Sequence, residues 1–136
     1  MKAGAVALLF AIIIGCAARS DAKEKMLGQE FNLKIGQKAR IKGEDLTINF
    51  SSVAEDSRCP EGVDCIWAGN AKIVLKLSKS NGASTSIELN TNTEPREKSF
   101  ERYEIVLKKL SPYPKKDSSI KKKDYVATLV VKKIPN

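Results

Sequence analysis

This chain of 136 residues contains no histidine, only three cysteines and a single tryptophan. The absence of histidine excludes the serine, histidine and aspartate triad of many hydrolases. A structural zinc site takes four ligands from cysteine and histidine, and three cysteines cannot supply them. Cys59 and Cys65 stand six positions apart, so the C-x-x-C motif of thioredoxin-like redox proteins is also missing. We therefore predict a protein that is not an enzyme, with no catalytic residues, no metal and no cofactor.

Long apolar runs are also scarce, because the only one extends from Ala3 to Ile14, directly after Lys2. It is shorter than the roughly 20 residues that a membrane-spanning helix requires. Polar residues follow it at positions 19–21. A positive charge, a short apolar run and small residues in this order are typical of a secretory signal. We expect residues 1–15 to be a signal peptide and the protein to be exported.

The end of the apolar run carries a more specific motif. Its residues 13–16, Ile-Ile-Gly-Cys, resemble the lipobox of bacterial lipoprotein precursors. The resemblance implies that the chain is cut before Cys16 and that a lipid on Cys16 anchors it to the membrane. Ala17 follows, and the lack of aspartate there resembles lipoproteins of the outer membrane. The expected location is the bacterial cell envelope, on the outer membrane if the source has one.

An ordinary secretory signal, cut after Ala18 or Ala22, is the alternative, and it predicts a secreted or periplasmic protein. An odd number of cysteines in an exported protein requires an explanation. Lipidation of Cys16 explains it and leaves Cys59 and Cys65 as a pair, but cleavage after Ala22 does so as well. The count excludes only a mature chain with a free Cys16.

Cleavage before Cys16 leaves enough chain for one compact domain. We expect a polar tether over residues 16–29 and a single domain over 30–136. Loss of Lys2 leaves 23 basic residues against 16 acidic ones, a net charge of +7. An exported basic domain fits an anionic envelope polymer or lipid rather than nucleic acid. Alternatively, the lysines only solvate the surface and protect sheet edges, and they are concentrated at Lys115, Lys116, Lys121, Lys122, Lys123, Lys132 and Lys133.

The rest of the chain alternates apolar and polar residues with the period of a β-strand. Six segments show this alternation: 31–35, 46–50, 73–77, 84–89, 103–107 and 125–132. Asn81-Gly82 predicts a hairpin with a type I′ turn, in which both central residues have positive φ. The pattern predicts an all-β antiparallel sandwich, immunoglobulin-like, of six to seven strands, with a small β-barrel as the alternative.

Residues 55–71, EDSRCPEGVDCIWAGNA, are the most distinctive segment. Pro60 and Gly62 favour a tight turn that would bring Cys59 and Cys65 together as a disulfide. Such a small closed loop stabilises by about 2 kcal/mol in the chain-entropy model. Trp67 is either an exposed platform for a sugar or a protein partner, or a residue packed over the disulfide. The prevalence of buried tryptophan in small β domains favours packing.

The signature D-S-R-C-P-x-x-V-x-C-x-W-A-G-x-A, with the later P-Y-P, resembles a group of small exported bacterial proteins to which no activity is assigned. The resemblance covers the chain from about Phe31 and implies a β-rich secreted or lipid-anchored domain, without a functional residue.

Two functional hypotheses remain at this point. The first is a noncatalytic envelope lipoprotein that binds a polymer or a protein partner, with Arg58, Pro60 and Trp67 in its binding loop. The second is a protease inhibitor that inserts Arg58 from the disulfide-braced loop into an acidic pocket, since rigidity lowers the entropy lost on binding. Pairing of Arg58 with Asp56 or Asp64 is the structural alternative, and we favour it.

Overall fold

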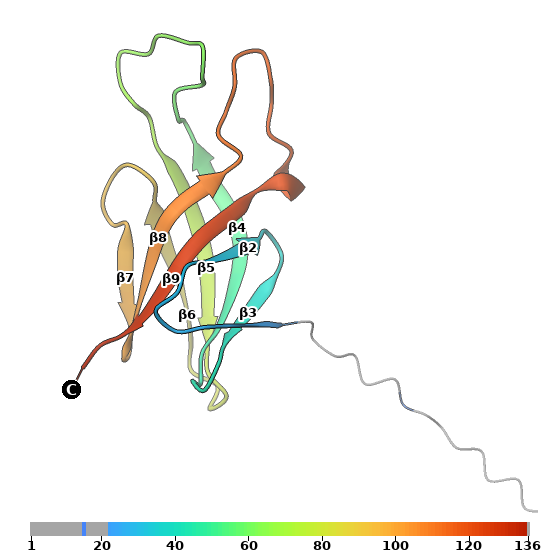
Figure 1. Cartoon of the computed structure of the whole chain (residues 1–136), viewed down its shortest axis with the longest axis vertical. Helices are drawn as coiled ribbons and strands as arrows, with labels where there is room; N and C mark the ends of the chain where they lie inside the picture. The colour runs from blue at the N-terminus through green and yellow to red at the C-terminus, as the bar shows by residue number, and fades with distance from the viewer. Residues whose placement is uncertain (1–14, 16–21, 136) are drawn as a thin grey trace, which may run out of the picture.

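The computed structural model describes Gly15 and residues 22–135, and its strands form two sheets (Figure 1). The first sheet has the order β1-β3-β4-β5-β6, formed by Lys23–Lys25, Lys38–Ile41, Thr47–Asp56, Ala71–Ser78 and Ser84–Asn90. The second has the order β2-β9-β8-β7, formed by Phe31–Lys34, Val126–Lys133, Tyr103–Ser111 and Glu97–Phe100. A short 3-10 helix, η1 (Lys122–Asp124), precedes β9.

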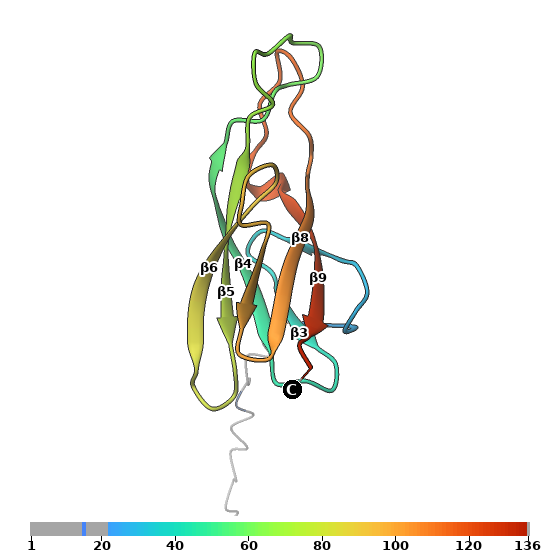
Figure 2. The same ribbon diagram turned by 90° about the vertical axis from the view of Figure 1, so that its left-hand side faces the viewer.

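The two sheets pack face to face without closing into a barrel (Figure 2). All strand pairs are antiparallel except β1 with β3. The predicted all-β sandwich is therefore confirmed, and the barrel alternative is not. Consecutive strands are neighbours from β3 to β6, whereas immunoglobulin constant domains order their strands ABED and CFG. Alternation along a strand carries no information about this connectivity.

The described residues form nine strands, more than the six to seven that were predicted. The additional strands β1, β3 and β7 have only three or four residues each, too few for a clear alternation. Strand β1 lies inside the predicted tether 16–29 and pairs with β3. In addition, the Gly28 amide donates to the Val131 carbonyl at 2.8 Å. The part of this segment from residue 23 onward is thus folded onto the sandwich.

The core lies between the sheets and follows the alternation seen in the sequence. In β5, Ile73, Leu75 and Leu77 have no exposed surface, while the residues between them face outward. Burying such side chains is worth roughly 1.5–3 kcal/mol each. Strand β9 is buried on both faces from Ala127 to Val131, because it lies between β2 and β8. Its apolar residues on both faces indicated this central position in advance.

The predicted hairpin between β5 and β6 is present, but its turn is of a different type. Positive φ occurs at Gly82 (89°) and not at Asn81. The Gly82 amide donates to the Lys79 carbonyl at 3.2 Å, and the Lys79 amide donates to the Ala83 carbonyl at 2.9 Å. This is the pattern of a three-residue loop that ends in a left-handed glycine, so the type I′ prediction is wrong.

The two ends of the sandwich differ. Two long loops, which we call the tip (residues 57–70 and 112–124), project together from one end (Figures 1 and 2). The opposite end, which we call the base, consists of the short turns 42–46, 79–83 and 101–102. The predicted signal peptide, apart from Gly15, and Cys16 lie outside the described residues. Within the described part, no helix is long and apolar enough to cross a bilayer.

Candidate functional site

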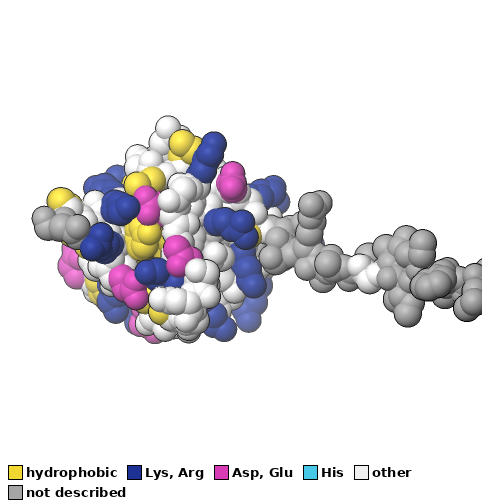
Figure 3. Space-filling model, turned by 90° about the horizontal axis from the view of Figure 1, so that it is seen from below, with side chains coloured by type: hydrophobic (Ala, Val, Ile, Leu, Met, Phe, Trp, Pro, Cys, Tyr) yellow, Lys and Arg dark blue, Asp and Glu magenta, His cyan; other side chains and the backbone are white. Residues whose placement is uncertain are grey.

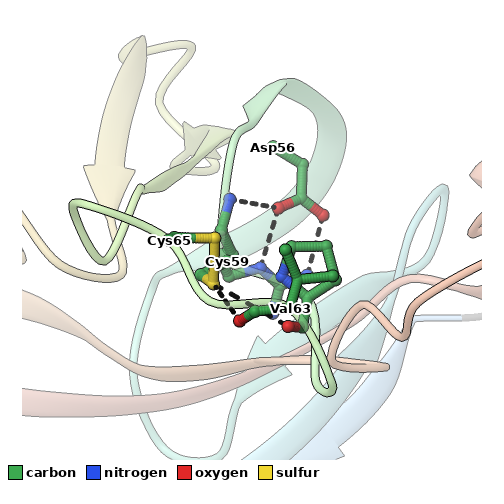
Figure 4. Close-up of a disulfide and its surroundings, with 6 residues drawn as sticks. Asp56, Cys59, Val63 and Cys65 are labelled. Atoms are coloured by element: carbon green, nitrogen blue, oxygen red, sulfur yellow. Dashed lines mark hydrogen bonds and ion pairs between the residues drawn. A yellow bond between two sulfur atoms is a disulfide. The ribbon is translucent and has the colours of Figure 1, made fainter.

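The tip loop that follows β4 is closed by the predicted disulfide between Cys59 and Cys65, whose Cα atoms are 5.9 Å apart (Figure 4). Inside the closed segment, the Val63 amide donates to the Pro60 carbonyl at 3.2 Å. Gly62 has a φ of 83°, a conformation that glycine adopts without strain. The predicted turn at Pro60 and Gly62 and the predicted disulfide are both confirmed.

Arg58, immediately before the disulfide, points into the protein, and its side chain is only 5% exposed. Its Nε and Nη2 atoms donate to the two carboxylate oxygens of Asp56, each at 2.8 Å. Nη1 donates to the Leu110 carbonyl at 2.7 Å and Nη2 to the Pro112 carbonyl at 3.0 Å. The guanidinium also lies over the Tyr113 ring, 5.2 Å from its centroid. Arg58 therefore joins the end of β4 to the end of β8.

Asp56 accepts a further hydrogen bond from the hydroxyl of Tyr125 at 2.9 Å. Burial alone would raise the pKa of Asp56, but the hydrogen bonds from Arg58 and Tyr125 and the charge of Arg58 outweigh it and lower that pKa. Burial, together with the neighbouring Asp56 carboxylate, raises the pKa of Tyr125 to about 12. Asp56 and Arg58 thus form an ion pair in which both are charged, and the neutral Tyr125 hydroxyl donates to the Asp56 carboxylate.

The two tip loops are also joined by their backbones. The Glu61 amide donates to the Pro114 carbonyl and the Lys116 amide donates to the Glu61 carbonyl, each at 3.0 Å. This pair forms a short parallel bridge between residues 61 and 115. The bridge and Arg58 therefore join the two loops, while the disulfide closes the first of them.

The returning arm of the loop approaches the first arm closely at Gly69. A β-carbon at position 69 would lie 1.8 Å from the Ser57 carbonyl oxygen, and the φ there is 70°. Next to it, the Asn70 side-chain oxygen accepts the backbone amides of Asn92 and Thr93 at 3.0 and 3.3 Å. The Asn92 side chain donates to the Gly69 carbonyl at 3.0 Å. The loop 91–96 therefore supports the tip from the side.

This braced tip presents apolar side chains to solvent. Ile66 is 94% exposed and Trp67 is 72% exposed, and Val63 and Tyr113 lie in the same two loops. Elsewhere in the described residues only two large apolar side chains are exposed, Met26 and Ile134, at 48% and 39%. Exposed apolar side chains that gather at one place are typical of interaction surfaces. The favoured sequence interpretation, in which Trp67 packs over the disulfide, is wrong.

The three residues of the predicted binding loop have different environments. Trp67 is exposed and Pro60 is half-buried, whereas Arg58 is buried and bonded to Asp56, as the structural alternative required. Arg58 is not available to a partner, so the inhibitor hypothesis loses the residue on which it depended. Within the described part of the chain, no group of three or more histidine, cysteine or acidic residues is placed to hold a metal ion.

Sequence reasoning missed three contributors to this site: Ile66, Tyr125 and Asn70. Ile66 follows Cys65 directly, and one apolar residue in a polar loop is too weak a pattern to indicate exposure. Tyr125 was predicted only as a strand residue. Its contact with Asp56 spans 69 positions of sequence, which only the packing of the two sheets brings together.

Comparison with models of known protein families, with curated protein sequences and with solved structures gave no match for this chain.

Proposed function

We propose that this chain is a noncatalytic cell-envelope lipoprotein, anchored through Cys16, whose tip binds a protein partner. The observation that carries the proposal is the exposure of Ile66 and Trp67 at the end of a loop held by a disulfide and a buried arginine. Tryptophan is among the residues that contribute most to protein interfaces, and a rigid loop loses little entropy on binding.

The charges of the tip favour a protein over an anionic polymer. Five lysines of the tip are accompanied by Glu61, Asp64, Asp117 and Asp124, all exposed. Apart from Arg58, which is neutralised by Asp56, the charges of both signs are nearly balanced. A surface that selects a polyanion would carry one sign of charge. An apolar centre within a mixed polar rim is the usual arrangement at protein interfaces.

Photo-crosslinking in cells tests the binding surface. A photoreactive amino acid replacing Ile66 should give a discrete crosslinked species with an envelope protein. The same amino acid replacing Ile134, which is exposed and lies beside the base turn 101–102, where its amide donates to the Arg102 carbonyl at 2.7 Å, is the matched control and should not give it. The species should also disappear when Trp67→Ser is added to the chain labelled at position 66. Equal crosslinking from both positions, or none from position 66, would contradict the proposal.

Intact mass of the membrane-extracted protein tests the anchor. We expect a chain that begins at Cys16 and carries two or three acyl groups. Cys59 and Cys65 should react with an alkylating agent only after reduction, because they form the disulfide. An unmodified chain that begins after Ala18 or Ala22 would instead indicate a diffusible protein.

A further inference from the structure

A groove beside β1 is strongly basic. Its volume is about 330 Å³, and it lies where the edge of the first sheet meets the second. Four of its eight lining residues are lysines, namely Lys23, Lys25, Lys34 and Lys38. The other four are Asn32, Leu33, Gln37 and Val126. No acidic side chain lines it, so the groove attracts anions.

The positive charge of this groove is not neutralised from within the described part of the chain. The described residues form four ion pairs, and none of these pairs involves a lysine of the groove. The ammonium nitrogen of Lys25 lies over the Phe31 ring, 5.9 Å from its centroid, a cation–π contact that leaves its charge in place. Among the other described lysines, three are paired: Lys72 with Glu88, Lys79 with Glu101 and Lys133 with Glu44.

The basic surface continues from the groove onto the outer face of the first sheet. Lys38 also lines a second groove, of about 430 Å³, and the strand register places it in one row with Asn49 and Lys76. This second groove likewise has no acidic side chain in its lining. Seen from the base, Lys and Arg side chains gather next to the place where the chain enters the domain (Figure 3). The two basic grooves therefore share Lys38 and lie near the start of the folded domain.

The position of this surface in the chain indicates its partner. Six residues separate Cys16 from Lys23, and the seven steps between their Cα atoms span at most about 25 Å in a fully extended chain. A lipid on Cys16 would therefore keep the groove close to the membrane, where anionic headgroups attract lysines strongly. We propose that the groove beside β1 binds the anionic phospholipid headgroups of the membrane that holds the anchor. This inference rests on the proposed lipidation of Cys16.

The orientation of the domain follows from this contact. Figure 1 places β1, the blue strand at the start of the domain, toward the base, and both ribbon views place the loops of the tip at the other end (Figures 1 and 2). With the groove on the headgroups, the tip points away from the bilayer and Trp67 stays in water. The basic surface near the anchor and the apolar tip then have separate tasks, one for the membrane and one for the protein partner.

Lysine labelling tests the contact. The mature protein is inserted into phosphatidylcholine nanodiscs with and without phosphatidylglycerol, and the reaction of each lysine with an amine reagent is followed by mass spectrometry. Phosphatidylglycerol should slow labelling of Lys23, Lys25, Lys34 and Lys38 by about fivefold or more, the effect expected of a lysine near an anionic surface. Lys115 and Lys116 at the tip are internal controls and should not change. Equal slowing at the tip, or no slowing in the groove, would overturn the proposal.

Two additions make the test specific. The triple variant Lys25→Gln, Lys34→Gln, Lys38→Gln should abolish the protection of Lys23, whereas Lys115→Gln, Lys116→Gln, Lys121→Gln, with the same change of charge, should preserve it. Trp67 is the only tryptophan of the chain, so its fluorescence reports on the tip alone. Brominated lipids should leave it unquenched, and quenching would show instead that the tip enters the membrane.

The outcomes also separate this inference from the proposed function. The intact mass of the same sample reports whether Cys16 is acylated, independently of the lysine reactions. Protein without an acyl group is mixed with vesicles of the same two compositions, and the same comparison of groove and tip lysines is made. If Cys16 is acylated but phosphatidylglycerol does not slow the labelling of the groove lysines, the proposed headgroup contact is rejected and the proposed lipid anchor stands.

Discussion

The tip and the base of the sandwich are built on opposite principles. At the base, short turns are joined by polar side-chain contacts, such as the hydrogen bond from Tyr103 to Glu44 at 2.8 Å and the pairing of Lys79 with Glu101. At the tip, two long loops are held by a disulfide, by Arg58 and by backbone bonds between the loops. The tip also exposes Ile66 and Trp67, whereas the base presents mainly polar residues.

This difference shows that the fold restrains the tip, although the exposed side chains of the tip contribute nothing to the hydrophobic core. Short turns between paired strands are ordered by the strands themselves, so the base requires little reinforcement. A loop such as 57–70 has no such support, and it is ordered because buried groups restrain both of its arms. A side chain that is 94% exposed, as Ile66 is, does not stabilise the fold, so its fixed position is available for a partner.

Loss of Arg58 should be the strongest disruption of the tip. Arg58→Ala leaves the Asp56 carboxylate in a largely buried place without its ion pair and removes the donor to the Leu110 carbonyl. We expect the free energy of unfolding to fall by about 3 to 5 kcal/mol, as for other broken buried pairs. Urea denaturation followed by circular dichroism measures it. Arg40→Ala, an exposed arginine of β3, is the control, and an equal loss there would contradict this account.

Gly69→Ala should follow, with Gly82→Ala as its counterpart at the base. Both glycines have positive φ, so both variants carry the strain of a left-handed alanine, roughly 1–2 kcal/mol. Only at position 69 does the added carbon meet backbone, 1.8 Å from the Ser57 oxygen, while at position 82 nothing lies within 4 Å. The loss of stability should therefore be clearly larger at the tip. Thermal unfolding measures both variants. An equal loss of stability in the two would mean that the arms of the loop 57–70 can move apart at position 69 without destabilising the fold.

Two tyrosines allow the smallest and most specific comparison. Tyr125→Phe removes the hydrogen bond to Asp56 at the tip, and Tyr103→Phe removes the one to Glu44 at the base. We expect Tyr125→Phe to cost about 1 kcal/mol near neutral pH. Glu44 is half-buried and keeps its ion pair with Lys133 at 3.2 Å when Tyr103 is replaced, so the effect at the base should be smaller.

The pH dependence identifies the tip as the source of that effect. The folded pKa of Asp56 is lowered, so its contribution is present above the unfolded pKa near 4 and is lost as the pH falls through the folded pKa. The pKa of Tyr125 is raised to about 12, so its contribution is present below pH 10 and is lost as the pH rises through about 12. The stability difference between wild type and Tyr125→Phe should shrink at both extremes. A difference that stays constant with pH would contradict the assigned hydrogen bond.

Different parts of the structure could be anticipated from the sequence to different degrees. The long strands β4, β5, β8 and β9 were predicted because each alternates over at least five residues. The disulfide was predicted because Pro60 and Gly62 favour a turn between its cysteines. The strands β1, β3 and β7 were missed because three or four residues give too short a pattern. The exposure of Trp67 was missed because burial depends on what the rest of the chain places over a residue.

Local pattern and composition were enough to predict the class of fold, the disulfide and the basic character of the chain. The roles of the charged and aromatic residues near the disulfide, in contrast, depend on how the chain packs in three dimensions. The tertiary structure buried Arg58 against Asp56 and Tyr125, left Ile66 and Trp67 in water, and placed Lys34 and Lys38 beside Lys23 and Lys25. The burial of Arg58 and the exposure of Ile66 and Trp67 depend on how the two sheets pack. The grouping of the lysines depends on the pairing of β1 with the edge of the first sheet. The order of neighbouring residues specifies neither the packing nor the pairing.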